Sequence, residues 1–227
     1  MSTADTISTV DTMSTFDIMI TFFQKGGVFM YPILIVLALG IVIALERYIY
    51  LTIAKTGNRK LWKVIIPMVK TGRFDQANEI INKSHAAICR ILSYGMDRIK
   101  VARRRDDLET ALEEGLMEVI PKLEKRTHYL ATLANIATLL GLLGTIMGLI
   151  QAFTAVANAD PADKANLLSE SISVAMNTTA FGLMAAIPML LVYTLLQTKT
   201  TEVVDSLEMA SVKFMNAVQE VKARASK

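Results

Sequence analysis

Three long runs of apolar residues alternate with polar, helix-patterned segments along the chain. The runs cover residues 28–47, 129–156 and 172–196. Each reaches the roughly 20 apolar residues that a helix needs to cross the core of a bilayer. The first run is closed by Glu46 and Arg47, and the second and third carry no charged residue. The pattern therefore predicts three transmembrane helices.

The segment between the first and second runs has the spacing of amphipathic helices. Apolar side chains recur there at intervals of three and four residues, at Leu108, Leu112, Leu116, Val119 and Leu123. No turn signal separates Lys125 from Leu130. We therefore expect one helix that runs from this segment into the second span, with any bend at Pro121.

Apolar residues keep the same spacing after the third run, at Val204, Leu207, Ser211, Phe214, Val218 and Val221. The third span is therefore also expected to continue as a long helix. Gly57, Pro67 and Gly72 are expected to break the region after the first span into shorter helices. The predicted fold is all-α: an integral membrane protein with three transmembrane helices, the second and third extended into a cytoplasmic helical bundle.

Composition supports the membrane prediction, and the distribution of charge predicts the orientation of the spans. The chain is 52% hydrophobic with a mean hydropathy of +0.40, which is too apolar for a soluble domain of this size. Lys and Arg concentrate between the first and second runs and after the third, and the side rich in these residues stays in the cytoplasm. We expect a periplasmic N-terminal segment at 1–27, a cytoplasmic helical domain at 48–128, a periplasmic loop at 157–171 and a cytoplasmic C-terminal helix at 197–227. The N-terminal segment lacks a cleavage signature and is expected to remain, either as an interfacial helix or as a disordered leader.

Redox, metal and enzymatic chemistry find little support in the sequence. Cys89 is the only cysteine, which suggests a small core residue, and His85 and His128 have no companion ligands at metal spacing. No nucleophile lies beside a base at a recognisable spacing, so we expect neither an enzyme nor a bound cofactor. The basic cluster at 103–105 is followed at once by two aspartates, which favours a solvated helix surface over nucleic-acid binding.

Small and hydroxyl-bearing residues share one face of the second span and one face of the third. The second span carries Gly141, Gly144, Thr145 and Gly148, and the third carries Ser171, Ala175, Thr178, Gly182 and Ala185. Thr179 lies about 100° around the helix axis from Thr178. Such faces let helices approach closely, and a membrane threonine usually bonds its own backbone, so packing is the simplest interpretation of each residue.

Helix packing alone does not explain Asn177 or the lack of charged residues in the second and third spans. An unpaired amide in an apolar medium costs several kcal/mol, so Asn177 needs a partner on a neighbouring helix or subunit. Neither the second nor the third span contains Asp, Glu, Lys, Arg or His, at least one of which an ion transporter acting alone would normally carry. If this protein moves ions, another chain therefore supplies the charged group.

The stretches "GLLGT" and "TTAFGLMAAIP" resemble the paired signature of the MotA/TolQ/ExbB proton-channel family. The three spans, the large cytoplasmic insertion and the Glu46–Arg47 pair are similar to the ExbB and TolQ branch. The resemblance implies a homopentamer in a bacterial inner membrane, whose second and third spans line a pore around two copies of a single-span ExbD- or TolR-like partner. A membrane Asp of that partner would take up the ion, and Thr145 and Thr179 match the family's threonines beside it. Ion flow would then move the partner and do work at the outer membrane or envelope, with a TonB-like or other envelope protein as a further partner.

One departure from the family changes the expected ion. Val174 stands where ExbB has a glutamate in the third span, and Thr178 gives this chain a pair of adjacent hydroxyls. Thr145, Thr178 and Thr179 around the partner's Asp could form the oxygen cage that Na⁺ prefers, whereas a proton needs only titratable groups and water. We expect H⁺ or Na⁺ as the transported ion, with a transient Na⁺ site at these threonines as the sharper hypothesis.

A non-conducting membrane scaffold is the alternative function. Its small faces, with Gly141, Gly144, Gly148 and Gly182, would only pack helices, and its cytoplasmic helices would recruit partners. Replacing Thr178 and Thr179 by Val separates the two hypotheses. A scaffold should still assemble and work, whereas an ion pathway should assemble and stop conducting.

Overall fold

A computed structural model describes residues 26–99, 105–157 and 159–225 of the chain. The helices in these ranges are α2 (Met30–Lys70), α3 (Phe74–Lys83), α4 (Ala87–Ile99), α5 (Arg105–Glu124), α6 (Thr127–Ala157) and α7 (Lys164–Ala225). No strand occurs in the described residues, so the predicted all-α class is confirmed. The two predictions for the N-terminal segment, an interfacial helix or a leader, fall almost wholly outside the described residues, as does most of the basic cluster.

Three helical stretches are long and apolar enough to cross a membrane: α2, α6 with α5 before it, and α7. Each of them is longer than the predicted span that it overlaps. Only 17 to 28% of the residues in their most apolar windows are buried inside the chain. Most of their apolar surface is therefore left for lipid or for other chains.

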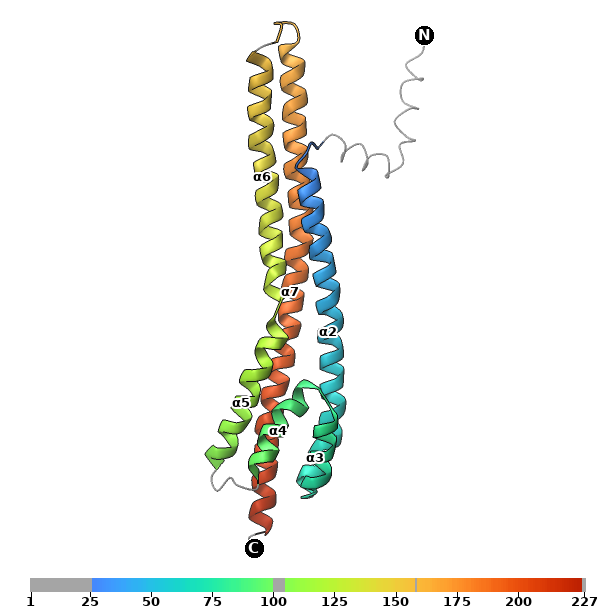
Figure 1. Ribbon diagram of the computed structural model, residues 1–227, viewed down its shortest axis with the longest axis vertical. Helices are drawn as coiled ribbons and strands as arrows, with labels where there is room; N and C mark the ends of the chain where they lie inside the picture. Colours follow the sequence, from blue (N-terminus) through green and yellow to red (C-terminus); the bar gives the residue numbers. More distant parts are fainter. Residues whose placement is uncertain (1–25, 100–104, 158, 226–227) are drawn as a thin grey trace, which may run out of the picture. The chain divides into compact units, whose positions relative to one another are not determined.

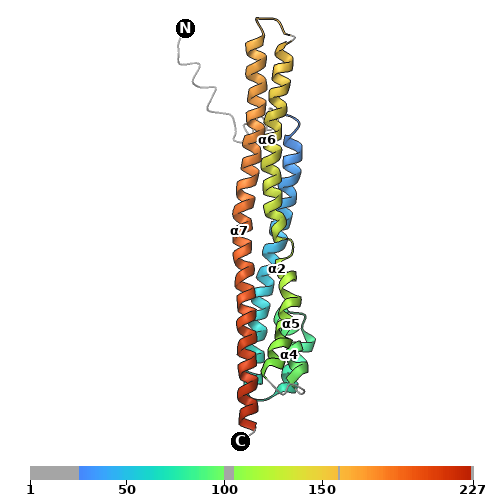
Figure 2. The same ribbon diagram turned by 90° about the vertical axis from the view of Figure 1, so that its left-hand side faces the viewer.

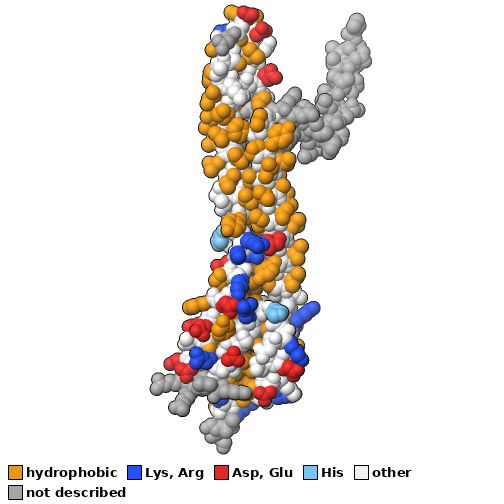
Figure 3. Space-filling model, in the orientation of Figure 1, with side chains coloured by type: hydrophobic (Ala, Val, Ile, Leu, Met, Phe, Trp, Pro, Cys, Tyr) orange, Lys and Arg blue, Asp and Glu red, His pale blue; other side chains and the backbone are white. Residues whose placement is uncertain are grey.

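The chain divides into two compact units. Unit 1 comprises Met1–Val42 and Tyr129–Val192, and so holds the first part of α2, nearly all of α6 and the first half of α7. In this unit α6 and α7 run side by side in both ribbon views (Figures 1 and 2). Its buried cluster consists mainly of small residues: Ile33, Ala134, Ala137, Ala185, Ala186 and Met189. Hydrophobic side chains cover most of its visible outer face (Figure 3).

Unit 2 comprises Ile43–His128 and Tyr193–Lys227, and its helices form a bundle with a core of large side chains. Phe214, Leu92 and Ile65 lie at its centre, each 0% exposed. Helix α4 packs against α5, where a Cβ on Gly115 would lie 2.9 Å from the Cα of Ile91. Charged side chains are distributed over the visible surface of this unit (Figure 3). The predicted continuation of the third span is confirmed, because α7 is a single helix of 62 residues.

Helix α2 continues through two of the positions that were expected to break it. Gly57 and Pro67 both lie inside the helix, so these two predicted breaks are wrong. A glycine costs a helix only about 1 kcal/mol, which tertiary packing can offset. Pro67 falls in the last turn, between Ile65 and Val69, which are both fully buried in the core of unit 2. The break at Gly72 is confirmed, because this residue adopts a φ of 75° in the turn that follows the helix.

The expected single helix from the cytoplasmic segment into the second span is also wrong. Helix α5 ends at Glu124 and α6 begins at Thr127, while Pro121 lies inside α5. Arg126, in the turn between them, has a φ of 71°, a left-handed conformation that stops a helix. Arg47 donates from Nη2 to the carbonyl of Leu123 at 3.0 Å and so satisfies a terminal carbonyl of α5. The contact that fixes this turn therefore comes from an arginine far away in the sequence, and no helix-breaking residue at the turn itself predicts it.

Candidate functional site

The glycines of the predicted small-residue face of α6 turn toward α7 within unit 1. A Cβ built on Gly141 would lie 3.3 Å from the Cα of Gly182. A Cβ built on Gly148 would lie 2.7 Å from the Cβ of Ala175. In the structure, these glycines therefore bring two helices of one chain into close contact.

Thr145 and Thr179 both bond to the same turn of α6. The hydroxyl of Thr179, on α7, donates to the carbonyl of Gly141 at 2.8 Å, and that of Thr145 donates to the carbonyl of Leu142 at 2.6 Å. Both side chains are partly exposed. The structure thus brings these two predicted pathway residues together at one place on the α6–α7 pair.

Thr178 points elsewhere. It is 2% exposed, and its hydroxyl lies 2.5 Å from the carbonyl oxygen of Gly26 and 2.9 Å from that of Val174. A Cβ on Gly144 would overlap its side chain. Because Gly26 lies just before α2, Thr178 is held between the entry to α2 and the faces of α6 and α7. The structure therefore does not bring the three predicted hydroxyls into one open set.

Asn177 is half-buried, and its amide makes no side-chain hydrogen bond to another described residue. An amide in the apolar part of a membrane needs such a bond. Of the two predicted partners, one on a neighbouring helix is not found among the described residues, and one on a neighbouring subunit stays a prediction.

A polar stripe on α6 went unnoticed in the sequence. Thr132, Asn135 and Thr138 follow one another at intervals of three residues, and all three are exposed. Thr145 lies seven residues after Thr138, so the stripe continues on the same helix face with a drift of about 20°. The signal was present in "ATLANIATLL", where one amide and two threonines, each three residues apart, interrupt an apolar run. A face that carries these groups is poorly suited to contact lipid tails.

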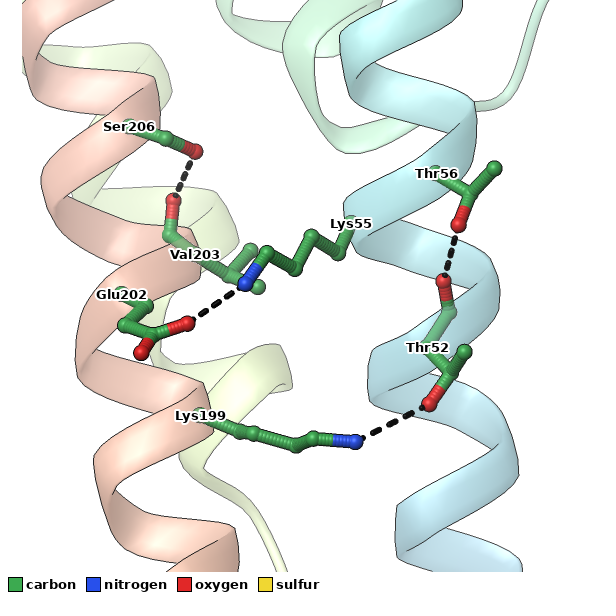
Figure 4. Close-up of polar contacts among 7 residues, drawn as sticks. All are labelled: Thr52, Lys55, Thr56, Lys199, Glu202, Val203 and Ser206. Atoms are coloured by element: carbon green, nitrogen blue, oxygen red, sulfur yellow. Dashed lines mark hydrogen bonds and ion pairs between the residues drawn. The ribbon is translucent and has the colours of Figure 1, made fainter.

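In unit 2, a group of polar contacts links α2 with α7 (Figure 4). Lys55 of α2 contacts the Glu202 carboxylate of α7 at 2.5 Å. Lys199 Nζ lies 3.4 Å from Thr52 Oγ1 and 3.7 Å from the ring centroid of Tyr48. The hydrogen bond from Lys55 holds the pKa of the Glu202 carboxyl below its usual value. These contacts hold the two helices together beyond the predicted ends of their spans.

The glutamate of the Glu46–Arg47 pair contacts the turn between α5 and α6. Arg126 Nη1 lies 3.2 Å from Glu46 Oε1, while Arg47 bonds to the end of α5. Arg47 is 3% exposed although it carries a charge, and it also stacks its guanidinium 5.2 Å from the ring centroid of Tyr50. The Glu46–Arg47 pair therefore has a structural role, because it holds the turn from which α6 begins.

Cys89 lies in the core of unit 2, as expected from its isolation in the sequence. It is 1% exposed, and burial raises the pKa of its thiol. A buried thiol with a raised pKa is a poor nucleophile. The residue therefore acts as a small apolar core residue.

Comparisons with known proteins give one consistent result. A model of the "MotA/TolQ/ExbB proton channel family" matches residues 83–209, which include both spans with the threonines. An ExbB homolog from Methanothermobacter thermautotrophicus is 28% identical over 190 residues, covering 82% of this chain and 66% of that protein. The biopolymer transport protein ExbB1 of Vibrio cholerae is 29% identical over 168 residues, 73% of each chain. The Tol-Pal system protein TolQ of Haemophilus influenzae is 36% identical over 83 residues, 37% of this chain and 36% of that protein.

Proposed function

Because this chain belongs to the MotA/TolQ/ExbB proton channel family, we propose that it is the pore-forming subunit of an ion-driven motor in the inner membrane. In this proposal several copies surround a partner chain, and ions flow down their gradient between them. The flow moves the partner, which does work at the outer membrane or envelope. Five copies around two single-span partners of the ExbD or TolR type is the expected assembly.

The hydrogen bonds of Thr145 and Thr179 carry this proposal. Each hydroxyl has one proton, and each donates it to a carbonyl of the same α6 turn. The oxygen lone pairs are left to accept a bond from water or to contact a cation. Two acceptor oxygens at one place in a segment without charge suit a cation that passes through without being trapped.

The charged group in this proposal comes from the partner. Residues 129–156 and 172–196 contain no Asp, Glu, Lys, Arg or His, whereas moving an ion through a membrane calls for a group that offsets its charge. A membrane carboxylate of the partner, placed beside Thr145 and Thr179, supplies it. The exposed polar stripe with Asn135 faces the same partner or the water around it.

Na⁺ is the ion that we propose for this chain, with H⁺ as the competing ion. Val174 leaves the third span without an acid of its own, so a relay of protons through this subunit lacks a titratable group. Because Thr178 is held against Gly26, the transient Na⁺ site draws on Thr145, Thr179 and the partner's carboxylate. Thr178 then serves mainly to hold α7 against the entry to α2.

Ion flux in liposomes that contain the complex purified with its native partner tests the proposal. We expect a Na⁺ gradient to drive flux, Thr179→Val to abolish most of it, and Thr154→Val to leave it intact. Thr154 is the control because its hydroxyl also donates to a carbonyl of α6, with Oγ1 2.8 Å from the oxygen of Ile150, but it is exposed and lies more than two turns beyond Thr145. Flux that follows only the pH gradient would replace Na⁺ by H⁺.

The scaffold is the second candidate, and one observation favours it. The glycines of α6 and α7 already pack on each other within a single chain, which needs no pore. A complex that assembles normally and conducts no ion, while both Thr178→Val and Thr179→Val leave its cellular work unchanged, would establish the scaffold and end the motor proposal.

A further inference from the structure

Two lysines cross between α2 and α7 in unit 2, and only one of them contacts an acid. In Figure 4, Lys55 reaches from α2 toward Glu202, and Lys199 reaches from α7 toward α2. Lys55 is paired with the Glu202 carboxylate at 2.5 Å. Lys199 has no carboxylate within ion-pair distance in the described part of the chain. One glutamate therefore faces two lysines, and one positive charge is left over.

The ammonium group of Lys199 is held in place but keeps one free donor. Its Nζ lies 3.4 Å from Thr52 Oγ1 and 3.7 Å from the ring centroid of Tyr48. Thr52 donates its own proton to the carbonyl of Tyr48, so its oxygen is left to accept from Lys199. The two contacts use two of the three N–H groups. A lysine that is already held in this way loses little side-chain entropy when it binds a ligand through the third.

The ammonium group lies at the depth of lipid headgroups. The third apolar run ends at residue 196, and Lys199 is three residues beyond it, about 4.5 Å along the helix axis. The first run ends at residue 47, and Tyr48 follows directly. The headgroup region is roughly 5 to 8 Å thick on each side of a bilayer. Lysine and tyrosine are also the side chains that typically lie at this depth, with the polar end toward water.

Exposed apolar side chains lie on the same two helices, one turn closer to the membrane core. Leu195 precedes Lys199 by one turn and is 67% exposed. Leu45 precedes Tyr48 by about one turn and is 59% exposed. All four residues belong to unit 2. A positive charge beside exposed apolar surface suits an amphiphile better than a free ion.

We propose that Lys199, held by Tyr48 and Thr52, binds the phosphate of an anionic phospholipid, whose acyl chains cover the exposed apolar side chains of α2 and α7 in unit 2. A zwitterionic lipid fits less well, because the excess positive charge of the lysines repels its ammonium group. Such binding requires the membrane spans but not the proposed flow of ions.

The melting temperature of the full-length chain, in the assembly that it forms in a neutral detergent, measures this binding. Dioctanoyl phosphatidylglycerol is the anionic probe, and dioctanoyl phosphatidylcholine is the zwitterionic one. We expect a saturable rise with the first and a smaller rise with the second, because a ligand that binds only the folded state stabilises it. Lys199→Met should raise the half-saturating concentration of phosphatidylglycerol about fivefold, which corresponds to the roughly 1 kcal/mol that one lysine contributes near an anionic lipid surface.

Variants at two other positions serve as controls. Lys213→Met makes the same change at an exposed position of α7, about 21 Å farther along the helix, and should keep the full response. Tyr48→Leu removes the ring beneath the ammonium group and should weaken the response, whereas Tyr48→Phe keeps a ring there and should preserve it.

Three results would overturn the proposal. The first is a phosphatidylglycerol response that is unchanged in both Lys199→Met and Tyr48→Leu. The second is a rise in inorganic phosphate equal to that in phosphatidylglycerol, which would mean that the site takes free phosphate. The third is a Lys199→Met chain that loses copies from its assembly, by native mass spectrometry, while its lipid response is intact. A second copy of the chain would then cover the site.

Thr179→Val separates the lipid site from the proposed function. It should abolish flux in liposomes and leave the phosphatidylglycerol response unchanged. If the complex conducts no ion and the response still depends on Lys199, the lipid site stands and the pore fails. If the complex conducts and no variant alters the response, the pore stands and the lipid site fails.

Discussion

The two units bury residues of very different size, and the difference follows from their surroundings. The cluster of unit 1 includes four alanines, whereas that of unit 2 contains Phe214 and many leucines and isoleucines. In water, burial of large apolar side chains drives folding. Lipid tails are as apolar as leucine, so helices gain from close contact between small residues instead. Substitutions in the two units should therefore act through different physics.

The largest expected loss of stability comes from Phe214→Ala. The side chain is 0% exposed at the centre of unit 2, and its Cε1 would lie 3.0 Å from a Cβ on Gly95. We expect a loss of about 3 to 5 kcal/mol, since the substitution leaves a cavity in a close-packed core. Thermal unfolding of the full-length chain measures it. Phe214→Leu keeps most of the volume and should cost about 1.5 kcal/mol or less; equal losses for both would mean that packing does not hold this unit.

Gly182→Ala should show the opposite rule in unit 1, where adding one methyl is harmful. The new Cβ would lie 2.7 Å from the backbone oxygen of Ala137 and 3.0 Å from the Cα of Gly141. Backbone atoms cannot rotate away, so α6 and α7 must separate, at a cost of about 1 to 3 kcal/mol. The melting temperature in detergent measures this cost.

Gly57→Ala is the matched control for Gly182→Ala. Apart from the two neighbouring residues and the nearby helix backbone, no heavy atom in the described part of the chain lies within 4 Å of a Cβ built at Gly57. The change should stabilise α2 by up to about 1 kcal/mol, because alanine has the higher helix propensity. If Gly182→Ala behaves like Gly57→Ala, the close contact in unit 1 carries little energy.

The sequence predicted the elements that depend on composition and missed those that depend on rotation or on distant partners. The three spans and the length of α7 follow from long apolar runs, and the break at Gly72 from a local conformation. The rotation of about 100° between Thr178 and Thr179 follows from helix geometry, but the partner of the Thr178 hydroxyl could not be predicted. Its hydroxyl contact is with Gly26, 152 residues away in the sequence.

The turn between α5 and α6 shows the same limit. Nothing local at Lys125 and Arg126 signals it, and the arginine that bonds to the end of α5 is 76 residues away from its acceptor.

Asn135 was missed for a different reason. One amide in an apolar run does not lower the hydropathy enough to draw attention, and only its exposure on α6 gives it meaning.

Arg47→Ala tests whether that distant contact matters for stability. The change leaves the carbonyl of Leu123 without its donor and removes a buried charge whose Nε has no hydrogen-bond partner in the described residues. These effects oppose each other, and we expect a net loss of about 1 to 2 kcal/mol. Faster amide hydrogen exchange near Arg126 is the local readout. Arg59→Ala, at an exposed position on the same helix, should change stability by about 0.5 kcal/mol or less.

The smallest expected effect is a dependence of stability on pH, and it distinguishes the two units. Unit 2 has an ion pair between α2 and α7, whereas the predicted second and third spans contain no acidic or basic side chain that could form one. Lys55 lowers the pKa of Glu202 below the value of 4.5 that an unperturbed glutamate has. The stability that it adds is therefore present above pH 4.5 and is lost as the pH falls through the lower pKa of the folded state. Lys55→Met should melt slightly below the unaltered chain at neutral pH, and the difference should shrink on acidification and in high salt, since both side chains are about half exposed. A difference that stays constant as the pH falls would mean that Lys55 stabilises unit 2 through something other than its charge pair with Glu202.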